Sequence, residues 1–279
     1  MHRRDIPTTC FKSMAILYSS LFTGGRVTGT LWNDTIYGYW GNDVLRGGRG
    51  DDVIYGGNGS DQLYGDKGND SLFGGDSADY LSGGVGDDYL SGDGGHDWLY
   101  GQDGDDYLYG GDGWDQLFGG VGSDRLSGGD GNDQLNGDAG KDVLYGDAGN
   151  DDLMGGEDND LLHGGTGHDF LDGGNGNDRL IGGIGVDNVY GGEGDDIFLL
   201  TEGSGHDMIR DFVSGEDRIE LSSGMTDISI HSFGGAARIF NGSDLLAVVD
   251  GAADQLEQRG QFIVGSPFVF DGVTATPDL

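Results

Sequence analysis

The chain has 279 residues, including 61 Gly and 3 Pro, and its 50 acidic and 14 basic side chains give a net charge of −36. Such an acidic surface repels nucleic acid and anionic membranes and attracts cations, which argues against a nucleic-acid partner. A single cysteine, Cys10, excludes an internal disulfide framework, and the sequence has no apolar run of about 18 residues that would predict a transmembrane segment.

Residues 1–28 admit two interpretations. His2-Arg3-Arg4 followed by the apolar run at 14–22 resembles a secretory signal peptide, but Lys12 and two serines interrupt it and no small-x-small cleavage site follows. The interpretation that we favour is that residues 14–22 cover the first end of the repeat stack described next. We therefore expect 1–28 to be an N-terminal cap or leader.

From Gly29 to Leu199 the sequence repeats every nine residues, and nineteen lines of nine align without an insertion or deletion. One line reads Gly128-Gly129-Asp130-Gly131-Asn132-Asp133-Gln134-Leu135-Asn136. Column one is Gly and column six is Asp in every line, column eight is always apolar, and column four is Gly in sixteen lines. A repeat this short predicts a solenoid in which each unit packs on its neighbours.

Columns seven to nine read x-apolar-x, as in Val53-Ile54-Tyr55, which predicts a three-residue strand with its middle side chain in the core. We expect columns one to six to turn the chain through half a circuit, with Gly in columns one, two and four supplying positive φ. Two lines then make one coil, and stacked coils pair as parallel strands. The expected fold is all-β: a parallel β-roll, that is, a β-solenoid of nonapeptide repeats with 18 residues per coil. Its core would include Leu63, Leu72, Leu81, Leu90, Leu99 and Leu108.

The column-six aspartates predict cation sites. Lines two apart lie one above the other, so Asp133 and Asp151 meet across adjacent turns, beside Gly-rich loops that expose carbonyl oxygens. Carboxylates and carbonyls make a hard, all-oxygen site, which favours Ca²⁺ over Zn²⁺ and Mg²⁺. Because each line buries one side chain while ordering nine residues, we expect the repeats to be disordered without the metal.

These lines resemble the Gly-Gly-x-Gly-x-Asp-x-apolar-x nonapeptide of the RTX (repeats-in-toxin), hemolysin-type calcium-binding proteins, whose repeats form a parallel β-roll with Ca²⁺ in the turns. The resemblance covers residues 29–199 and implies that the column-six aspartates bind multiple Ca²⁺ ions. Trp32, Ser77 and Asp158 replace the column-four glycine in three lines. The implied metal ligands are Asp43, Asp52, Asp61, Asp70, Asp88, Asp97, Asp106, Asp115, Asp124, Asp133, Asp142, Asp151, Asp160, Asp169, Asp178, Asp187 and Asp196, with Asp34, Asp79 and Asp207 as further candidates that depart from the pattern.

After Leu199 the glycine density falls. Residues 202–210 still match columns four, six and eight after a displacement of two residues, which indicates a twentieth, slipped line. The segments 218–221, 228–233, 237–240 and 245–249 alternate like antiparallel strands and would form a small C-terminal β cap on the roll.

Residues 205–221 resemble the segment that follows the repeats in serralysin-type secreted proteases. In that family the C-terminal region carries an uncleaved type I secretion signal. The expected domains are therefore a cap or leader (1–28), the calcium-binding roll (29–199), a capping and secretion-related region (200–265) and a tail (266–279).

Catalytic motifs are missing from the sequence, which has neither His-Glu-x-x-His nor Gly-x-Ser-x-Gly, so we do not predict an enzyme. His96, His163 and His168 are interpreted as surface side chains rather than as metal ligands or catalytic groups. Outward aromatic residues leave two interpretations open, cross-strand stacking or a glycan- or partner-binding face. They include Tyr80, Tyr89, Trp98, Tyr107, Tyr109 and Phe118.

The function that we expect is calcium binding that drives the folding of a secreted, extracellular bacterial protein. It would be a structural or interaction module, exported unfolded by a type I exporter, with a possible cell-surface, matrix or glycan partner. The alternative is an accessory calcium-binding module of a secreted protease, lipase or hemolysin whose catalytic part is absent.

Overall fold

The computed structural model describes residues 15–18, 24–203, 205–213, 216–222, 225 and 228–250. This part of the chain contains strands and turns, so none of its segments is a helix that could cross a membrane. The predicted tail at 266–279 lies outside it, and of the predicted end cover at 14–22 only 15–18 are described. The chain divides into two compact units, Met1–Leu126 and Ser127–Leu279.

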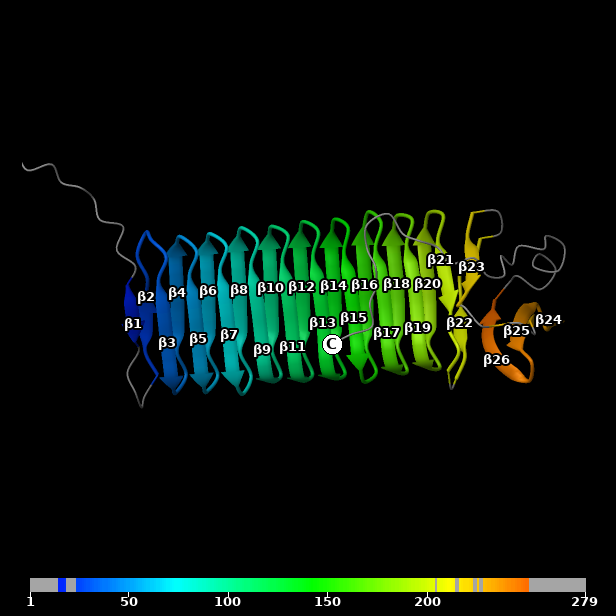
Figure 1. Ribbon diagram of the computed structural model, residues 1–279, viewed down its shortest axis with the longest axis horizontal. Helices are drawn as coiled ribbons and strands as arrows, with labels where there is room; N and C mark the ends of the chain where they lie inside the picture. Colours follow the sequence, from blue (N-terminus) through cyan, green and yellow to red (C-terminus); the bar gives the residue numbers. More distant parts are fainter. Residues whose placement is uncertain are drawn as a thin grey trace, which may run out of the picture. The chain divides into compact units, whose positions relative to one another are not determined.

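The first unit consists of two sheets of parallel strands that the chain visits in turn (Figure 1). One sheet has the order β1-β3-β5-β7-β9-β11 and the other β2-β4-β6-β8-β10-β12. The strands are β1 (Ile16–Tyr18), β2 (Arg26–Thr28), β3 (Thr35–Trp40), β4 (Val44–Arg49), β5 (Val53–Asn58), β6 (Gln62–Lys67), β7 (Ser71–Asp76), β8 (Tyr80–Val85), β9 (Tyr89–Gly95), β10 (Trp98–Asp103), β11 (Tyr107–Gly113) and β12 (Gln116–Val121). The next strand, β13 (Arg125–Gly131), crosses the boundary between the units.

The second unit repeats this arrangement and adds a C-terminal hairpin. One sheet contains β15-β17-β19-β21-β23 and the other β14-β16-β18-β20-β22-β26-β25-β24. The strands are β14 (Gln134–Ala139), β15 (Val143–Ala148), β16 (Asp152–Glu157), β17 (Leu161–Gly167), β18 (Phe170–Asn175), β19 (Arg179–Gly185), β20 (Asn188–Glu193), β21 (Ile197–Leu200), β22 (Asp207–Ile209), β23 (Arg218–Leu221), β24 (Ile228–Phe233), β25 (Ala236–Asn241) and β26 (Asp244–Val249).

The predicted β-roll is confirmed, with 18 residues per coil. Trp98 pairs with Gln116 and Leu99 with Leu117, and the same offset recurs from β2 to β12 in the first unit and from β14 to β21 in the second. The column-eight side chains form the core, as predicted, and Leu63 to Leu108 are fully buried. Because neighbouring strands are parallel, side chains of one column stack directly above one another.

The predicted strand length is wrong, because each regular strand has at least six residues rather than three. β5 continues from Tyr55 in column nine through Gly56, Gly57 and Asn58, and pairing with β7 resumes after Gly56. The turn is therefore confined to columns four to six. A backbone bend within the strand makes this possible, because Gly57 in column two has a φ of 104°.

The reason given for glycine in column one is also wrong. Gly56 does not have a left-handed φ. Instead, a Cβ atom at Gly56 would lie 2.5 Å from the carbonyl oxygen of Gly74 and 2.6 Å from Oδ2 of Asp61, closer than side-chain carbon atoms can approach. Column one is glycine because two oxygen atoms occupy the space that a side chain would need.

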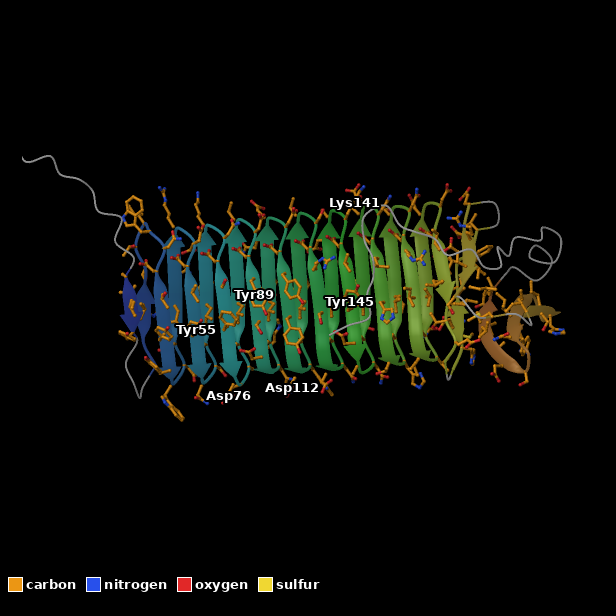
Figure 2. The ribbon with its side chains drawn as sticks, in the orientation of Figure 1. Tyr55, Asp76, Tyr89, Asp112, Lys141 and Tyr145 are labelled. Carbon is orange, nitrogen blue, oxygen red and sulfur yellow. The ribbon has the colours of Figure 1, made fainter. Side chains whose placement is uncertain are left out.

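Outward aromatic residues stack along the strands. In the first unit the ring centroids of Tyr37 and Tyr55 are 5.1 Å apart and those of Tyr55 and Phe73 are 5.0 Å apart, with interplanar angles of 8° and 11°. Figure 2 shows Tyr55 and Tyr89 over the strands, while Asp76 and Asp112 lie at the edge formed by turns. Nearly parallel rings at this separation are offset-stacked, so their faces cover one another.

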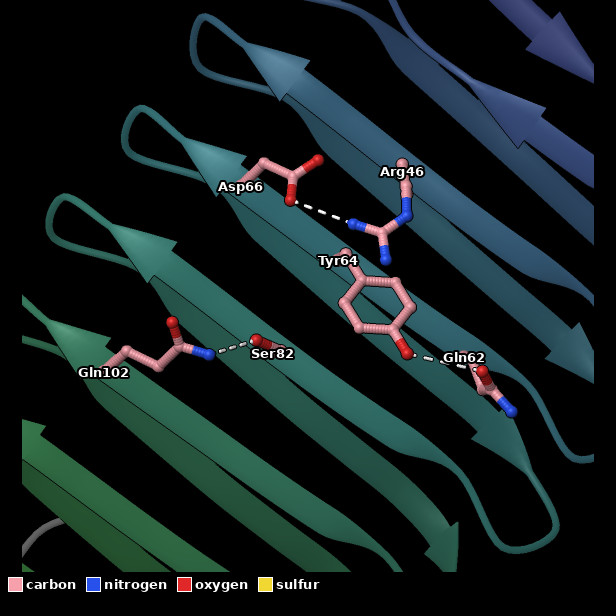
Figure 3. A network of polar contacts seen from close by, with 6 residues as sticks. All are labelled: Arg46, Gln62, Tyr64, Asp66, Ser82 and Gln102. Carbon is pink, nitrogen blue, oxygen red and sulfur yellow. Dashed lines mark hydrogen bonds and ion pairs between the residues drawn. The ribbon is translucent and has the colours of Figure 1, made fainter.

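Where column two is not glycine, its polar side chain can contact an outward-facing side chain of column nine. Asp66 in column two forms an ion pair with Arg46 at 3.1 Å, and Arg46 also lies 4.0 Å above the Tyr64 ring (Figure 3). Gln102, again in column two, donates to Oγ of Ser82 at 2.7 Å. The ion pair between Arg46 and Asp66 stabilises the roll only slightly, since both side chains are exposed and solvent screens their charges.

The C-terminal cap is confirmed, but its strands are not all antiparallel. β23 extends one sheet in parallel beside β21, and β26 extends the other in parallel beside β22. Among the described strands of the cap, β24 pairs with β25 and β25 with β26 in antiparallel fashion. Arg210 holds the junction, since it donates to Asn188 and forms an ion pair with Asp250 at 2.9 Å.

Candidate metal centre

The column-six aspartates lie where each turn enters a strand, and all nineteen are buried, with at most 4% of their surface exposed. One carboxylate oxygen, Oδ1, has the same kind of partner from Asp52 to Asp124 and from Asp151 to Asp196. It accepts the backbone N–H of the column-six aspartate eighteen residues earlier, as Asp61 does from Asp43 at 2.7 Å. In the first two lines Asp34 and Asp43 accept instead from Ala15 and Gly25. The predicted meeting of Asp133 and Asp151 across adjacent turns has this form, at 2.8 Å.

The second oxygen, Oδ2, is buried and has no hydrogen-bond partner in the described part of the chain at most of these positions. A buried carboxylate oxygen without a partner carries a large desolvation cost unless a cation or a proton compensates it. This holds for Asp43, Asp52, Asp61, Asp70, Asp79, Asp88, Asp97, Asp106, Asp151, Asp160, Asp169, Asp178, Asp187 and Asp196. Asp115, Asp124, Asp133 and Asp142 occupy the same column and are equally buried.

Each Oδ2 faces the column-one glycine of its own line. A Cβ atom added at Gly155 would lie 2.5 Å from Oδ2 of Asp160 and 2.5 Å from the carbonyl oxygen of Gly173 in the next coil. At Gly164 the corresponding distances, to Asp169 and Gly182, are also 2.5 Å. We call this pair of oxygen atoms beside each such glycine a cradle, and a carboxylate and a backbone carbonyl oxygen are the kinds of ligand that Ca²⁺ takes.

The donor set fits calcium. No described cluster contains three or more His, Cys, Asp or Glu side chains that could hold an ion together. Each cradle instead combines one carboxylate oxygen with backbone carbonyl oxygen, a hard set that suits Ca²⁺ and lacks the nitrogen and sulfur ligands of zinc sites. Each cradle therefore offers a calcium ion one carboxylate rather than a cluster of acidic side chains.

Burial also changes the acidity of these aspartates. It raises the pKa of Asp151 and Asp160 to about 8, and the charges of neighbouring column-six aspartates add to the effect. Burial likewise raises the pKa of Asp61 and Asp169 to about 6, although the backbone N–H that each accepts acts in the opposite direction. Without a cation, carboxylates such as those of Asp151 and Asp160 are therefore largely protonated at neutral pH, which reduces the repulsion along the row.

The lines that depart from the pattern differ from one another. In line one Oδ2 of Asp34 accepts the N–H of Thr30 at 2.5 Å, so that oxygen already has a protein partner. Asp79 follows the irregular Ser77 and Ala78, yet its Oδ2 is buried like those of regular lines. Asp207 lies in the slipped line, where burial first and the nearby Asp187 second raise its pKa.

Two aspartates that end the rows were missed by the sequence analysis. Asp217 occupies the column-six position after Asp196 at an offset of 21 residues, with Oδ1 accepting the N–H of Asp196 and Oδ2 that of Val213. Asp211 accepts the N–H groups of Gly191 and Gly192, each at 3.0 Å. An Asp two residues before the buried Ile219 is the pattern that could have identified Asp217.

The histidines have structural partners. Nδ1 of His96 accepts the N–H of Trp114 at 2.7 Å, and Nδ1 of His168 accepts that of Val186 at 2.9 Å. Asn150 accepts the N–H of His168 in the same way, and Asn132, Asn159 and Asn177 are further column-five acceptors. The His163 ring lies beside the Tyr145 ring, with the centroids 5.9 Å apart and the planes tilted by 50°. Burial lowers the pKa of His163.

The nonapeptide repeats match a known protein family. The family model of the RTX calcium-binding nonapeptide repeat, which spans four copies, matches residues 26–54, 55–90, 91–126, 127–162 and 163–198, well over half of the chain. The chain belongs to this family. Its repeats are therefore RTX calcium-binding repeats, as the sequence predicted. The match ends at 198, so the resemblance of 205–221 to the serralysin segment stays a prediction.

Solved structures with related folds include an extracellular lipase from Serratia marcescens, at 20% identity and a TM-score of 0.33. That match covers 70% of this chain and 40% of the lipase chain, so the chain spans less than half of the lipase. A hyperactive, Ca²⁺-dependent, β-helical antifreeze protein from an Antarctic bacterium matches at 23% identity and a TM-score of 0.38, over 77% of this chain and 86% of that protein. The curated proteins contain no match to the sequence.

Proposed function

We propose that the chain is a secreted β-roll whose folding is driven by calcium, with the column-six aspartates as ligands. The observation that carries this proposal is the row of buried Oδ2 atoms without a hydrogen-bond partner among the described residues. One column-eight side chain in each nine residues gives a thin core, and buried like charges oppose the fold. Cations in the cradles would remove that repulsion, so binding and folding become one event.

Dependence on calcium also supports a route of export. A chain that stays unfolded at the low calcium concentration of the cytosol can pass through a narrow type I exporter and fold outside the cell. For this to work, the calcium sites need dissociation constants in the range of extracellular modules, about 10⁻⁴ to 10⁻³ M. Tighter sites would fold the chain before export.

The role outside the cell that we infer is that of a structural or interaction module. The outward columns seven and nine of β3, β5, β7, β9 and β11 carry Thr, Val, Ser, Tyr and Phe but no charged residue, despite the net charge of −36. Stacking of the aromatic rings on one another supports a scaffold role for this face. A glycan or matrix partner would then contact ring edges and hydroxyl groups.

Circular dichroism of the metal-stripped full-length chain tests the proposal. We expect mostly coil without calcium and a cooperative gain of β structure on adding Ca²⁺, with a midpoint near the extracellular range. Mg²⁺ at the same concentration is the control and should have little effect, since it gives up its water ligands reluctantly. A chain that is fully folded after metal removal at neutral pH would contradict the proposal, and a midpoint below about 10⁻⁶ M would contradict the export route.

A further inference from the structure

Tyr89 and Tyr107 lie side by side on the outward face of the sheet that contains β9 and β11. Their backbones pair directly, so both side chains leave the sheet on the same face, where Figure 2 shows Tyr89. The two ring centroids are 5.4 Å apart and the ring planes differ by only 9°. The residues are 38% and 42% exposed, so a reagent in solvent can reach both phenols.

A proton acceptor lies beside this pair. Ser91, two residues after Tyr89, is a hydrogen-bond partner of the Tyr89 side chain. The Ser91 hydroxyl also donates to Oδ1 of Asp93 at 2.7 Å, and Asp93 is exposed. A phenol that loses an electron becomes strongly acidic, so its proton leaves with the electron. Ser91 and Asp93 give that proton a path to solvent.

We propose that Tyr89 and Tyr107 are a site of oxidative cross-linking, at which hydrogen peroxide, acting through a haem peroxidase or a similar one-electron oxidant, joins the two rings into dityrosine. Each phenol loses one electron and one proton and becomes a phenoxyl radical. The radicals join through the ring carbons beside the oxygens, and the hydrogen atoms on those carbons move to the oxygens as the rings regain their aromatic form. The two electrons and two protons convert one H₂O₂ into two H₂O, so the chain loses two hydrogen atoms.

The roll favours coupling within one chain over coupling between chains. Paired strands hold the two phenols at a fixed separation, which corresponds to a high effective concentration. A small rotation of the two side chains brings the ring carbons together, since neither ring is packed in the core. The net charge of −36 also makes two chains repel each other.

A bond between these rings would join two neighbouring coils covalently. The sequence has one cysteine, so an internal disulfide cannot do this. The bond closes a loop between residues 89 and 107, and a closed loop restricts the unfolded chain in the way that a disulfide does. The cross-link itself is independent of the proposed function, whereas its effect on calcium-dependent folding rests on that function.

Tyr55 and Phe73 provide a matched control in the same sheet. Their centroids are 5.0 Å apart and their planes differ by 11°, so their geometry is close to that of Tyr89 and Tyr107. Phe73 has no phenol and cannot form the radical. Phe73→Tyr supplies one and should produce a new cross-link between positions 55 and 73. This variant is made together with Tyr37→Phe, because Tyr37 also stacks on Tyr55, at an interplanar angle of 8°, and would compete for it.

Oxidation of the full chain, folded in Ca²⁺, by H₂O₂ and a haem peroxidase tests the proposal. We expect dityrosine fluorescence, a chain that stays monomeric on a denaturing gel, and a mass spectrum in which the peptides of Tyr89 and Tyr107 are joined with the loss of two hydrogen atoms. Tyr89→Phe and Tyr107→Phe should each abolish this linked peptide while they keep the stacked ring. Cross-linked dimers or hydroxylated tyrosine as the main products would overturn the proposal, as would a linked peptide that persists in either variant.

Circular dichroism in Ca²⁺ checks that each variant is folded, and if one of them is not, the other decides. The double variant Tyr37→Phe with Phe73→Tyr adds a test by gain, which loss of stability cannot imitate. A link between positions 55 and 73 supports stacking geometry as the cause of coupling. Absence of that link in the folded double variant would overturn it.

Calcium titrations of the cross-linked and the untreated chain measure the effect on folding. We expect the calcium midpoint in circular dichroism to fall by about twofold or more after cross-linking, because a closed loop makes unfolding less favourable. The Tyr89→Phe chain, oxidised in the same way, is the control and should show a smaller fall. An equal fall in both chains would overturn the stabilising role of this pair.

Failure of this inference and failure of the proposed function give different results. A chain that is fully folded in chelator, and that forms the same cross-link there, contradicts calcium-driven folding but supports the cross-linking site. A chain that folds only in Ca²⁺ and does not join positions 89 and 107 contradicts the site alone.

Discussion

The backbone N–H of Asp151 donates to Oδ1 of Asp169, which is eighteen residues later and 2.9 Å away. In the regular coils, a column-six carboxylate thus uses Oδ1 to join two coils, while Oδ2 forms part of a cradle. The two oxygens have separate roles, and a substitution by asparagine can retain the first while it removes the charge needed for the second. This separation makes the cation sites testable without disrupting the roll.

Asp151→Asn and Asp152→Asn form a matched pair, because the two residues are adjacent but Asp151 is buried and Asp152 is exposed. We expect Asp151→Asn to raise the calcium midpoint several-fold, since a site filled at ten times its dissociation constant contributes about 1.4 kcal/mol. Asp152→Asn should leave the midpoint nearly unchanged. Calcium titrations followed by circular dichroism measure both, and equal shifts would argue against Asp151 as a ligand.

Gly92→Ala and Gly94→Ala test the close packing of the cradle oxygens against the column-one glycine. At Gly92, in column one, a Cβ would lie 2.6 Å from the carbonyl oxygen of Gly110 and would also collide with Oδ2 of Asp97. At Gly94, in column three, the nearest atom is 4.0 Å away. Thermal unfolding in calcium should show a loss of about 1–3 kcal/mol for Gly92→Ala, as for other overpacked sites. Gly94→Ala should be close to neutral, and a similar loss for both would contradict the close approach.

The pH dependence should reverse when calcium is removed. Burial raises the pKa of Asp79, Asp88, Asp151 and Asp160 from 3.8 to about 8 in the folded chain. The folded state therefore binds more protons than the unfolded state, and its stability is greatest below pH 4 and is lost as the pH rises through about 8.

In metal-free buffer we therefore expect β structure to increase from pH 8 to pH 5, as measured by circular dichroism after removal of metal by a chelating resin. With calcium present the order is opposite, because calcium needs the deprotonated carboxylates, and the calcium midpoint should rise as the pH falls. A metal-free chain that loses structure on acidification over this range would contradict the raised pKa values.

His168 provides a test of the alternative that the histidines are metal ligands. Its Nδ1 accepts the N–H of Val186, a task that asparagine performs elsewhere in column five. His168→Asn should therefore keep both the calcium midpoint and the thermal stability. His168→Leu removes the acceptor and should cost about 0.5–1.5 kcal/mol. Calcium or zinc binding that depends on the imidazole would be lost in both variants and would contradict this assignment.

Much of the fold could be predicted from the sequence because the repeat has one period and one buried residue in each line. The core leucines, the offset of 18 residues and the position of the column-six aspartates all follow from that period. The strand length did not follow, since pairing resumes at Gly57, and an alternation pattern of side chains cannot show pairing between glycines. The need for glycine in column one arises from the next coil, because the carbonyl oxygen of Gly74 lies beside Gly56. Rules based on the neighbouring residues in the sequence cannot predict such a contact.

The ends of the roll could be predicted less well. The slip of two residues before Asp207 was visible in the sequence, but the closeness of its carboxylate to Asp187 depends on how β22 pairs with β20. The offset of 21 residues before Asp217 hid the equivalence of that residue to Asp196. The predicted ligands, the domain boundaries and the export route stay predictions that the experiments above address.

The direction of the aspartate hydrogen bonds bears on how such a protein can change during evolution. Each coil takes its acceptor from the coil that follows, as Asp43 does from Asp61, so an interior coil makes the same demands on its neighbours wherever it stands. Duplication or loss of one 18-residue coil within a unit therefore preserves every type of contact. Gain or loss of a single nine-residue line would instead move all later strands of that unit to the opposite sheet. Related genes should consequently differ in length by multiples of 54 nucleotides far more often than by odd multiples of 27.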